Sequence, residues 1–256
     1  MIHLVLPMAG RGSRFLSAGY KVPKPLINVG GWRMHELVLA NLWSPLVTRI
    51  TLVCQSDTAD QIDTTWLEEK LDAEVRLKVL SETTNGPATT VALALDGSPS
   101  GPSQRLIVAN TDQYLDTDMS HVVQEFVDSG SHLILGMEAD DPKWSFVKLD
   151  QETQKVSLVR EKEPISNLAT CGIYMFASEE EYLSGYQLMN DAQDFTNGGL
   201  YVAPLYNYLD FGTTNYVNLG EVDAIFYGLG TPEDLKRFLD SPVLEKAVAR
   251  TREIFS

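Results

Sequence analysis

Two kinds of apolar pattern alternate along the first half of the chain. Short runs rich in branched residues, which suit strands buried on both faces, recur at IHLVL, RITLVC, EVRLKVL, RLIVAN and HLILGM. Between them lie segments whose apolar residues repeat at helical spacing, namely MHELVLANLW, ADQIDTTWLEEKL, PATTVALAL and DMSHVVQEFVDS. This alternation predicts stacked βαβ units around a mainly parallel sheet with helices on both faces, an α/β fold.

The pattern changes at about Trp144. SFVKLD, VSLVREK and ATCGIYMF read as strands with no long helix between them, which predicts an antiparallel or mixed extension of the sheet. The remaining segments predict two helices (SEEEYLSGYQLM, YVAPLYNYLDFG), a last pair of strands (YVNLG, AIFYGL) and a helical tail (PEDLKRFL, PVLEKAVARTREIF). DGSPSGPSQ (residues 96–104) predicts a surface loop. We expect a single domain, residues 1–256, with parts at 1–143, 144–230 and 231–256.

The composition narrows the classes of protein that the chain can represent. Its 256 residues are 44% hydrophobic, enough for a substantial core. The formal net charge of −15 would repel phosphate backbones and anionic membranes, so neither nucleic acid nor a membrane is an expected partner. Cys54 and Cys171 lie in apolar stretches without metal-ligand spacing, which argues against a disulfide framework or a zinc site.

The start of the chain lacks the order of a secretory signal, and no run approaches the roughly 18 apolar residues of a membrane span. A cytoplasmic protein is expected.

Charge is distributed unevenly along this acidic chain. The first carboxylate is Glu36, and it is preceded by five basic residues: Arg11, Arg14, Lys21, Lys24 and Arg33. A segment of this kind predicts a local positive field for a small anion, although chance clustering stays open as an explanation.

A glycine-containing loop follows the first predicted strand. The segment GRGSRF (residues 10–15) would let the backbone approach a ligand and direct N–H groups toward it. A dinucleotide-binding loop would need a third glycine where Phe15 stands, and a Walker loop would need Gly-Lys-Ser/Thr, so both fail. Farther along, Lys24 stands between two prolines, which restrict the backbone and reduce the entropy lost when a charged ligand binds.

Together, LPMAGRGSRF and VPKPL resemble the signature of the sugar-phosphate nucleotidyltransferases, which include glucose-1-phosphate thymidylyltransferases, uridylyltransferases and cytidylyltransferases. The resemblance extends from His3 to Leu235. It implies a Rossmann-like, mainly parallel mixed sheet with helices on both faces, of the nucleotidyltransferase and GT-A type. It also implies transfer of NMP from an NTP to a sugar 1-phosphate or similar phosphorylated small molecule, with Mg²⁺ and with release of pyrophosphate. Residues 1–143 would then bind the nucleotide and residues 144–230 the acceptor.

The resemblance assigns roles to residues of the first segment. Arg14 would contact the outer phosphates and Lys24 the phosphoryl group being transferred. Negative charge builds up on both sides of the α-phosphorus during the displacement, so preset cations would lower the barrier. By the same resemblance, the nucleotide-binding loop would comprise Pro7, Met8, Ala9, Gly10 and Gly12.

Asp112 is the candidate Mg²⁺ ligand. It follows the apolar run RLIVAN, and carboxylates at the carboxyl ends of strands lie where open α/β sheets bind ligands. Magnesium is the hard, oxygen-seeking ion expected with a nucleoside triphosphate. The family's second metal-binding aspartate falls on Gly228 in this chain, and Asp223 is the nearest substitute, although Asp223 could equally be a turn residue.

The resemblance also assigns residues to the base and the acceptor. ETTNGP resembles the segment that reads the base, which places Ser81, Glu82 and Gly86 near it and leaves the base itself open. REKEP, WSFV and TCGIY resemble the elements around the acceptor. The acceptor-binding candidates are Ser145, Glu161, Lys162 and Thr170.

Two other functions stay open. A metal-dependent GT-A glycosyltransferase would use Asp116 and Asp118, which spell its DxD pattern, but both precede a helical segment and suit helix caps. A non-catalytic nucleotide-binding homologue is suggested by Gly228. An acceptor phosphate is already ionised, so no general base is required, and the four histidines are expected to be structural or solvated. Assembly as a homo-oligomer is left open.

Overall fold

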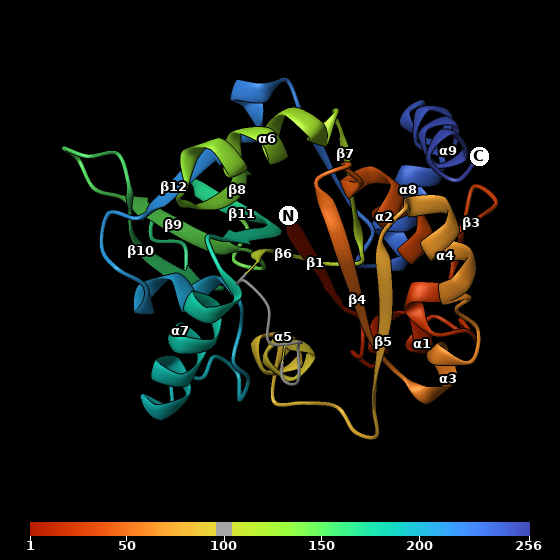
Figure 1. The fold of residues 1–256 in the computed structure, drawn as a ribbon, viewed down its shortest axis with the longest axis horizontal. Helices are drawn as coiled ribbons and strands as arrows, with labels where there is room; N and C mark the ends of the chain where they lie inside the picture. The colour runs from red at the N-terminus through yellow and green to blue at the C-terminus, as the bar shows by residue number, and fades with distance from the viewer. Residues whose placement is uncertain (96–103) are drawn as a thin grey trace.

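A nine-stranded sheet forms the centre of the computed structural model, which describes residues 1–95 and 104–256 (Figure 1). All but Gln104 of the predicted surface loop 96–104 lies outside the described residues. The main path of the sheet is β10-β9-β11-β6-β1-β4-β5, and β8 joins β11 to β12. The strands are β1 (Ile2–Pro7), β4 (Val47–Gln55), β5 (Glu74–Leu80), β6 (Arg105–Ala109), β8 (His132–Glu138), β9 (Ser145–Leu149), β10 (Val156–Glu161), β11 (Leu168–Phe176) and β12 (Thr214–Asn218).

The strand directions confirm a parallel centre with a mixed extension. β1 pairs in parallel with β4 and β6, and β4 pairs in parallel with β5. β11 runs antiparallel to β6, β8 and β9, and β9 runs antiparallel to β10. The last two predicted strands, β12 and β13 (Ile225–Gly228), do not pair with each other. β12 adds in parallel to β8, and β13 pairs with β7 (Gln113–Asp116), a strand that the apolar pattern missed.

Helices cover both faces of the sheet, as predicted. They are α1 (Ser13–Ser17), α2 (Met34–Leu42), α3 (Ser56–Ala59), α4 (Thr64–Leu71), α5 (Pro87–Leu95), α6 (Met119–Ser129), α7 (Glu179–Asp191), α8 (Pro232–Leu239) and α9 (Val243–Ile254). Short 3-10 helices occur at η1 (Lys24–Leu26), η2 (Ala203–Tyr208) and η3 (Leu219–Val222), and β2 (Asn28–Val29) pairs with β3 (Trp32–Arg33). Two predicted helices differ in detail. The segment around α3 and α4 is split because the Asp63 side chain caps α4, and YVAPLYNYLDFG yields only η2.

The alternating side chains of β1 enter two separate hydrophobic clusters. Leu4 packs with residues of α2 and α6, and Val5 packs with residues of α5 and α7. Figure 1 shows α6 and α5 on opposite sides of the sheet. Strands buried on both faces therefore read as continuous apolar runs. A third cluster lies beneath the glycine loop, where Phe15 of α1 packs with Leu37 of α2 and Phe238 of α8. The C-terminal helices thus support the loop that the site uses.

No helix within residues 1–95 and 104–256 is long and apolar enough to cross a membrane. Cys54 and Cys171 are both buried and free.

Candidate active site

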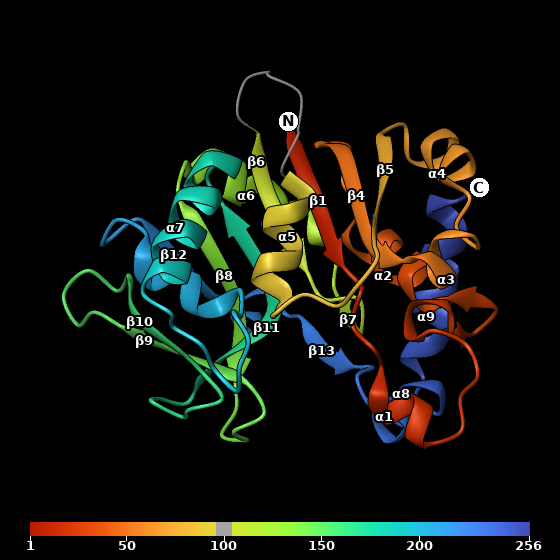
Figure 2. The ribbon, with the colours of Figure 1, turned by 90° about the horizontal axis from the view of Figure 1, so that it is seen from below.

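The parallel pairing of β1 with β6 places the glycine loop beside the segment that contains Asp112. Val5 of β1 lies opposite Val108 of β6, so the segments that follow these two strands leave the sheet side by side. Figure 2 shows both strands pointing toward the end of the molecule where α1 and β13 lie. The carboxyl ends of parallel strands are where open α/β sheets bind ligands.

Gly12 shapes the loop. Its φ of 59° lies in the left-handed region, and its carbonyl accepts hydrogen bonds from the backbone N–H groups of Phe15 (2.9 Å) and Leu16 (3.1 Å) as α1 begins. A Cβ on Gly12 would lie 3.1 Å from the Cβ of Lys24. Only glycine combines this backbone conformation with the close approach of Lys24.

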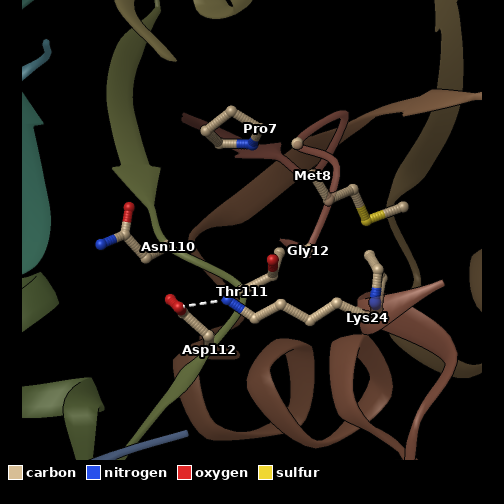
Figure 3. Close-up of a pocket in the computed structure, with 9 residues that line it drawn as sticks. Pro7, Met8, Gly12, Lys24, Asn110, Thr111 and Asp112 are labelled. Carbon is tan, nitrogen blue, oxygen red and sulfur yellow. Dashed lines mark hydrogen bonds and ion pairs between the residues drawn. The ribbon is translucent and has the colours of Figure 1, made fainter. Parts of the chain in front are cut away.

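Lys24 and Asp112 form an ion pair inside a cavity of about 230 Å³. The Lys24 ammonium donates a hydrogen bond to Oδ2 of Asp112, and both side chains are mostly buried (19% and 26% exposed). Figure 3 shows the lysine reaching across the cavity to the carboxylate. A backbone hydrogen bond holds Asp112 in place: the N–H of Leu229 donates to the carbonyl oxygen of Asp112 (2.7 Å). The cavity is lined by Pro7, Met8, Gly10, Gly12, Lys24, Pro25, Asn110, Thr111 and Asp112.

Asp112 fits a magnesium site in which the protein supplies one carboxylate and the substrate supplies further oxygen ligands. Mg²⁺ is usually held by one or two carboxylates together with water and phosphate oxygens. In the part of the chain that the structure describes, no group of three or more His, Cys, Asp or Glu side chains could hold a metal by itself. One carboxylate beside a cavity that could admit phosphate oxygens is compatible with Mg²⁺.

The structure corrects the prediction that Asp223 shares this metal. β13 runs antiparallel to β7, with Gly228 opposite Gln113 and Ile225 opposite Asp116. Asp112 therefore lies at one end of this ribbon and the exposed Asp223 beyond the other, about 13 Å or more away at about 3.3 Å per residue. Oxygen ligands of Mg²⁺ lie about 2 Å from the ion, so one ion cannot contact both carboxylates.

The DxD pair of the glycosyltransferase alternative is engaged elsewhere. Asp118 accepts a hydrogen bond from the backbone N–H of Ser120 (3.0 Å) and caps α6, as predicted, and this contact lowers the pKa of its carboxyl. Asp116 is not a cap; it forms an ion pair with Lys246 of α9 (3.0 Å). Neither residue lines the cavities described in this subsection.

A second cavity, of about 190 Å³, adjoins the first through Pro7 and Gly10. It is lined by Pro7, Ala9, Gly10, Thr83, Thr84, Gly86, Pro87 and Thr90. Gly86 has a φ of 136°, and a Cβ there would lie 2.3 Å from the carbonyl oxygen of Leu200, so no other residue fits. Ser81 and Glu82 are exposed and do not line the cavity; Thr83 and Thr84 do so instead.

A third cavity, also of about 190 Å³, adjoins the first through Asn110 and contains three of the four predicted acceptor residues. Ser145 donates a hydrogen bond to Glu161, and the Thr170 hydroxyl lies 3.0 Å from that of Tyr174. Burial raises the pKa of the Glu161 carboxyl. Lys162 is exposed beside this cavity, and its ammonium donates to the Tyr201 hydroxyl (2.9 Å).

The sequence did not identify Asn110, Lys143, Trp144 and Tyr201 as residues that line this third cavity. Gly172 explains the position of Asn110. Its φ of 77° lies where the register between β11 and β8 shifts, and a Cβ there would lie 2.3 Å from the Asn110 amide nitrogen. A glycine inside a buried strand is the signal that could have indicated this close approach.

Arg14 is exposed and does not line these cavities. Instead, Arg11 and Lys21 line a fourth cavity, of about 250 Å³, which shares Gly10 and Lys24 with the first.

Comparison with known proteins relates this geometry to one family. A sequence model described as nucleotidyl transferase matches residues 4–198. The bifunctional protein GlmU of Methanococcus aeolicus is 26% identical over 177 residues, which cover 68% of this chain and 40% of that protein. The chain thus spans less than half the length of this curated relative.

Solved structures share the fold over almost the whole chain. A nucleoside-diphosphate-sugar pyrophosphorylase from Vibrio cholerae has a TM-score of 0.76 and 27% identity, and the match covers 93% of this chain and all of that one. A candidate glucose-1-phosphate thymidylyltransferase from Bacillus anthracis has a TM-score of 0.76 at 22% identity, covering 99% and 96%. The inositol-1-phosphate CTP transferase of T. maritima has a TM-score of 0.69 at 15% identity, covering 98% and 96%. The last two show the fold alone.

Proposed function

This chain belongs to the nucleotidyl transferase family, and from that premise we propose that it transfers NMP from an NTP to a sugar 1-phosphate or similar phosphorylated small molecule, releasing pyrophosphate. One observation carries the proposal: the cavity of the Lys24–Asp112 ion pair adjoins one cavity on the glycine-loop side and another on the Glu161 side. We assign the base to the cavity at Gly86 and the acceptor to the cavity at Glu161.

The order of the cavities suits direct transfer. Pro7 and Gly10 border both the base and the phosphate cavities, and Asn110 borders both the phosphate and the acceptor cavities. An NTP whose base lies near Gly86 would place its α-phosphate near Lys24. An acceptor held near Glu161 and Lys162 would approach that phosphorus from the side of Asn110.

Electrostatic stabilisation is the main contribution that we propose for the protein. Lys24 is positioned to neutralise charge that develops around the α-phosphorus. Asp112 is the residue that would hold Mg²⁺, an ion that neutralises triphosphate charge when it is bound. No histidine lines these cavities in the described part of the chain, and His3, His35 and His132 are buried. The acceptor phosphate attacks without a general base because it is already ionised.

In this proposal the nucleotide-binding and acceptor-binding parts of the chain keep their predicted roles, but the first part also contributes to the acceptor cavity. Residues 1–143 would bind the nucleotide and 144–230 the acceptor, but Pro87 and Asn110 of the first part also line the acceptor cavity. The 27% identity with the Vibrio cholerae pyrophosphorylase supports a nucleotide-sugar product. The cytoplasmic location and a homo-oligomeric state stay predictions.

Release of pyrophosphate from a panel of NTPs with phosphorylated acceptors tests the proposal. Release that requires both substrates with Mg²⁺, and that is lost in Asp112→Asn, would support it. Transfer of sugar from a nucleotide sugar without pyrophosphate formation would instead indicate a glycosyltransferase. Nucleotide binding without turnover across the panel would indicate a non-catalytic homologue.

A further inference from the structure

The fourth cavity differs from the others in its charge. Three basic residues, Arg11, Lys21 and Lys24, line it together with one acidic residue, Asp57. In residues 1–95 and 104–256, neither Arg11 nor Lys21 takes part in an ion pair within 4.0 Å. An excess of cations around a hollow, in a chain whose net charge is −15, suits an anion with more than one charge.

Local structure brings the two unpaired cations to one cavity. Arg11 stands in the loop between Gly10 and Gly12. After α1, the chain reverses at Gly19, whose φ is 87°, and the backbone N–H of Tyr20 donates to the carbonyl of Phe15 (3.1 Å). The Tyr20 ring packs edge-on against Phe15 at 5.1 Å between centroids. This turn places Lys21 beside the start of the loop, where it lines the same cavity as Arg11; Arg14 of α1 does not line this cavity.

The cavity continues from the Asp112 cavity on the side away from the acceptor. The two share Met8, Gly10, Lys24 and Pro25, whereas the acceptor cavity adjoins through Asn110. Figure 3 shows Asn110 and the main chain of Lys24 on opposite sides of the Asp112 cavity. In a phosphoryl displacement the attacking and leaving oxygens lie roughly in line on opposite sides of the phosphorus. An acceptor entering past Asn110 would therefore expel its leaving group toward Arg11 and Lys21.

We propose that Arg11 and Lys21 bind the β- and γ-phosphates of the NTP and hold the pyrophosphate product, the role that the family resemblance assigns to Arg14. The inference rests on the proposed function. An acceptor phosphate oxygen forms a bond to the α-phosphorus, and the bond from this phosphorus to the bridging oxygen of the β-phosphate breaks. The electron pair of that bond stays on pyrophosphate, whose added charge Arg11 and Lys21 neutralise.

Binding of inorganic pyrophosphate, measured by calorimetry with and without MgCl₂, tests the assignment without requiring turnover. Arg11→Ala and Lys21→Ala should each weaken binding about tenfold, the usual scale for one hydrogen bond to a charged group. Asp57→Asn should tighten binding because it removes the opposing carboxylate. Arg252→Ala, which removes an exposed charge from α9, should leave the affinity within about twofold.

Arg14→Ala decides between the two assignments. We expect it to change pyrophosphate affinity less than Arg11→Ala or Lys21→Ala does. A larger loss in Arg14→Ala, with binding by the Arg11 and Lys21 variants unchanged, would overturn the inference. If pyrophosphate binding depends on Arg11 and Lys21 but no NTP and acceptor pair yields product, the proposed function fails and the anion site stands. If product forms but these two variants neither weaken pyrophosphate binding nor raise the KM for NTP, the anion site fails alone.

Discussion

The ammonium of Lys24 donates a hydrogen bond to the carboxylate of Asp112 across 88 residues of sequence. The lysine comes from η1, and the aspartate comes from the short link between β6 and β7. The cavity that contains this ion pair shares Pro7 and Gly10 with the cavity that we assign to the base, and Asn110 with the cavity that we assign to the acceptor.

Replacing Lys24 by methionine keeps most of the side-chain volume and removes the charge. If the ammonium stabilises the transition state, the rate of pyrophosphate release should fall about 10²–10³-fold. Lys236→Met is a matched control because Lys236 forms an exposed ion pair with Asp240 on α8. Equal rates in the two variants would contradict the role of Lys24.

Gly10→Ala should separate binding from stability. A Cβ on Gly10 meets no protein atom within 4 Å, so the thermal transition should not move. The added methyl group would nevertheless project into the region where three cavities meet, and the KM for NTP should rise. Gly12→Ala makes the contrasting change. Its left-handed backbone and the nearby Lys24 should lower the transition temperature. Unchanged nucleotide kinetics in Gly10→Ala would show that the ligand does not pass this residue.

Glu161 should make acceptor binding sensitive to pH. Burial raises the pKa of its carboxyl, so the carboxylate takes up a proton at a higher pH than an ordinary glutamate does. As the pH falls through this raised value, the KM for the acceptor should increase, whereas Glu161→Gln should show a flatter profile.

The raised pKa of Glu161 should also make the stability of the fold depend on pH, with stability falling as the pH rises. A folded-state pKa above the unfolded value means that the native state binds more protons in that interval. The free energy of unfolding of the wild type should therefore fall, relative to Glu161→Gln, as the pH rises through it. Parallel stability curves for the two proteins would contradict the raised pKa.

Asp112→Asn and Asp223→Asn should behave differently in a magnesium titration of activity. The first removes the carboxylate next to Lys24, so activity should be lost or should require far more Mg²⁺. The second alters an exposed residue at the far end of the β7–β13 ribbon and should leave the titration unchanged. A loss of equal size in both variants would mean that the metal site extends beyond the Asp112 cavity.

The sequence predicted the parts of the site that depend on local chemistry. Adjacent residues in the sequence mark out the loop glycines, the proline-flanked Lys24 and the strand-end Asp112. The parallel pairing of β1 with β6 then brings these positions together. The apolar runs and helical spacings likewise predicted the layers, because burial on both faces leaves a strong pattern.

The remaining residues depend on contacts that the local sequence does not contain. The antiparallel register of β13 against β7 excludes Asp223, and that register is set by pairing between segments about 110 residues apart. Gly86 packs closely against Leu200, and Thr83 and Thr84, rather than Ser81 and Glu82, line the cavity that we assign to the base. Arg11 and Lys21 gain their common cavity from the reversal at Gly19.

Isotope transfer from a labelled acceptor would reveal whether its phosphate attacks the α-phosphorus in the cavity of Lys24 and Asp112. With ¹⁸O in the phosphate of a sugar phosphate and unlabelled NTP, mass spectrometry should find all of the label in the nucleotide-sugar product and none in pyrophosphate. Lys24→Met should form that product at least about 100-fold more slowly. Label in pyrophosphate, loss of label to water, or full activity without Lys24 would contradict direct attack of an acceptor phosphate on the α-phosphorus at this site.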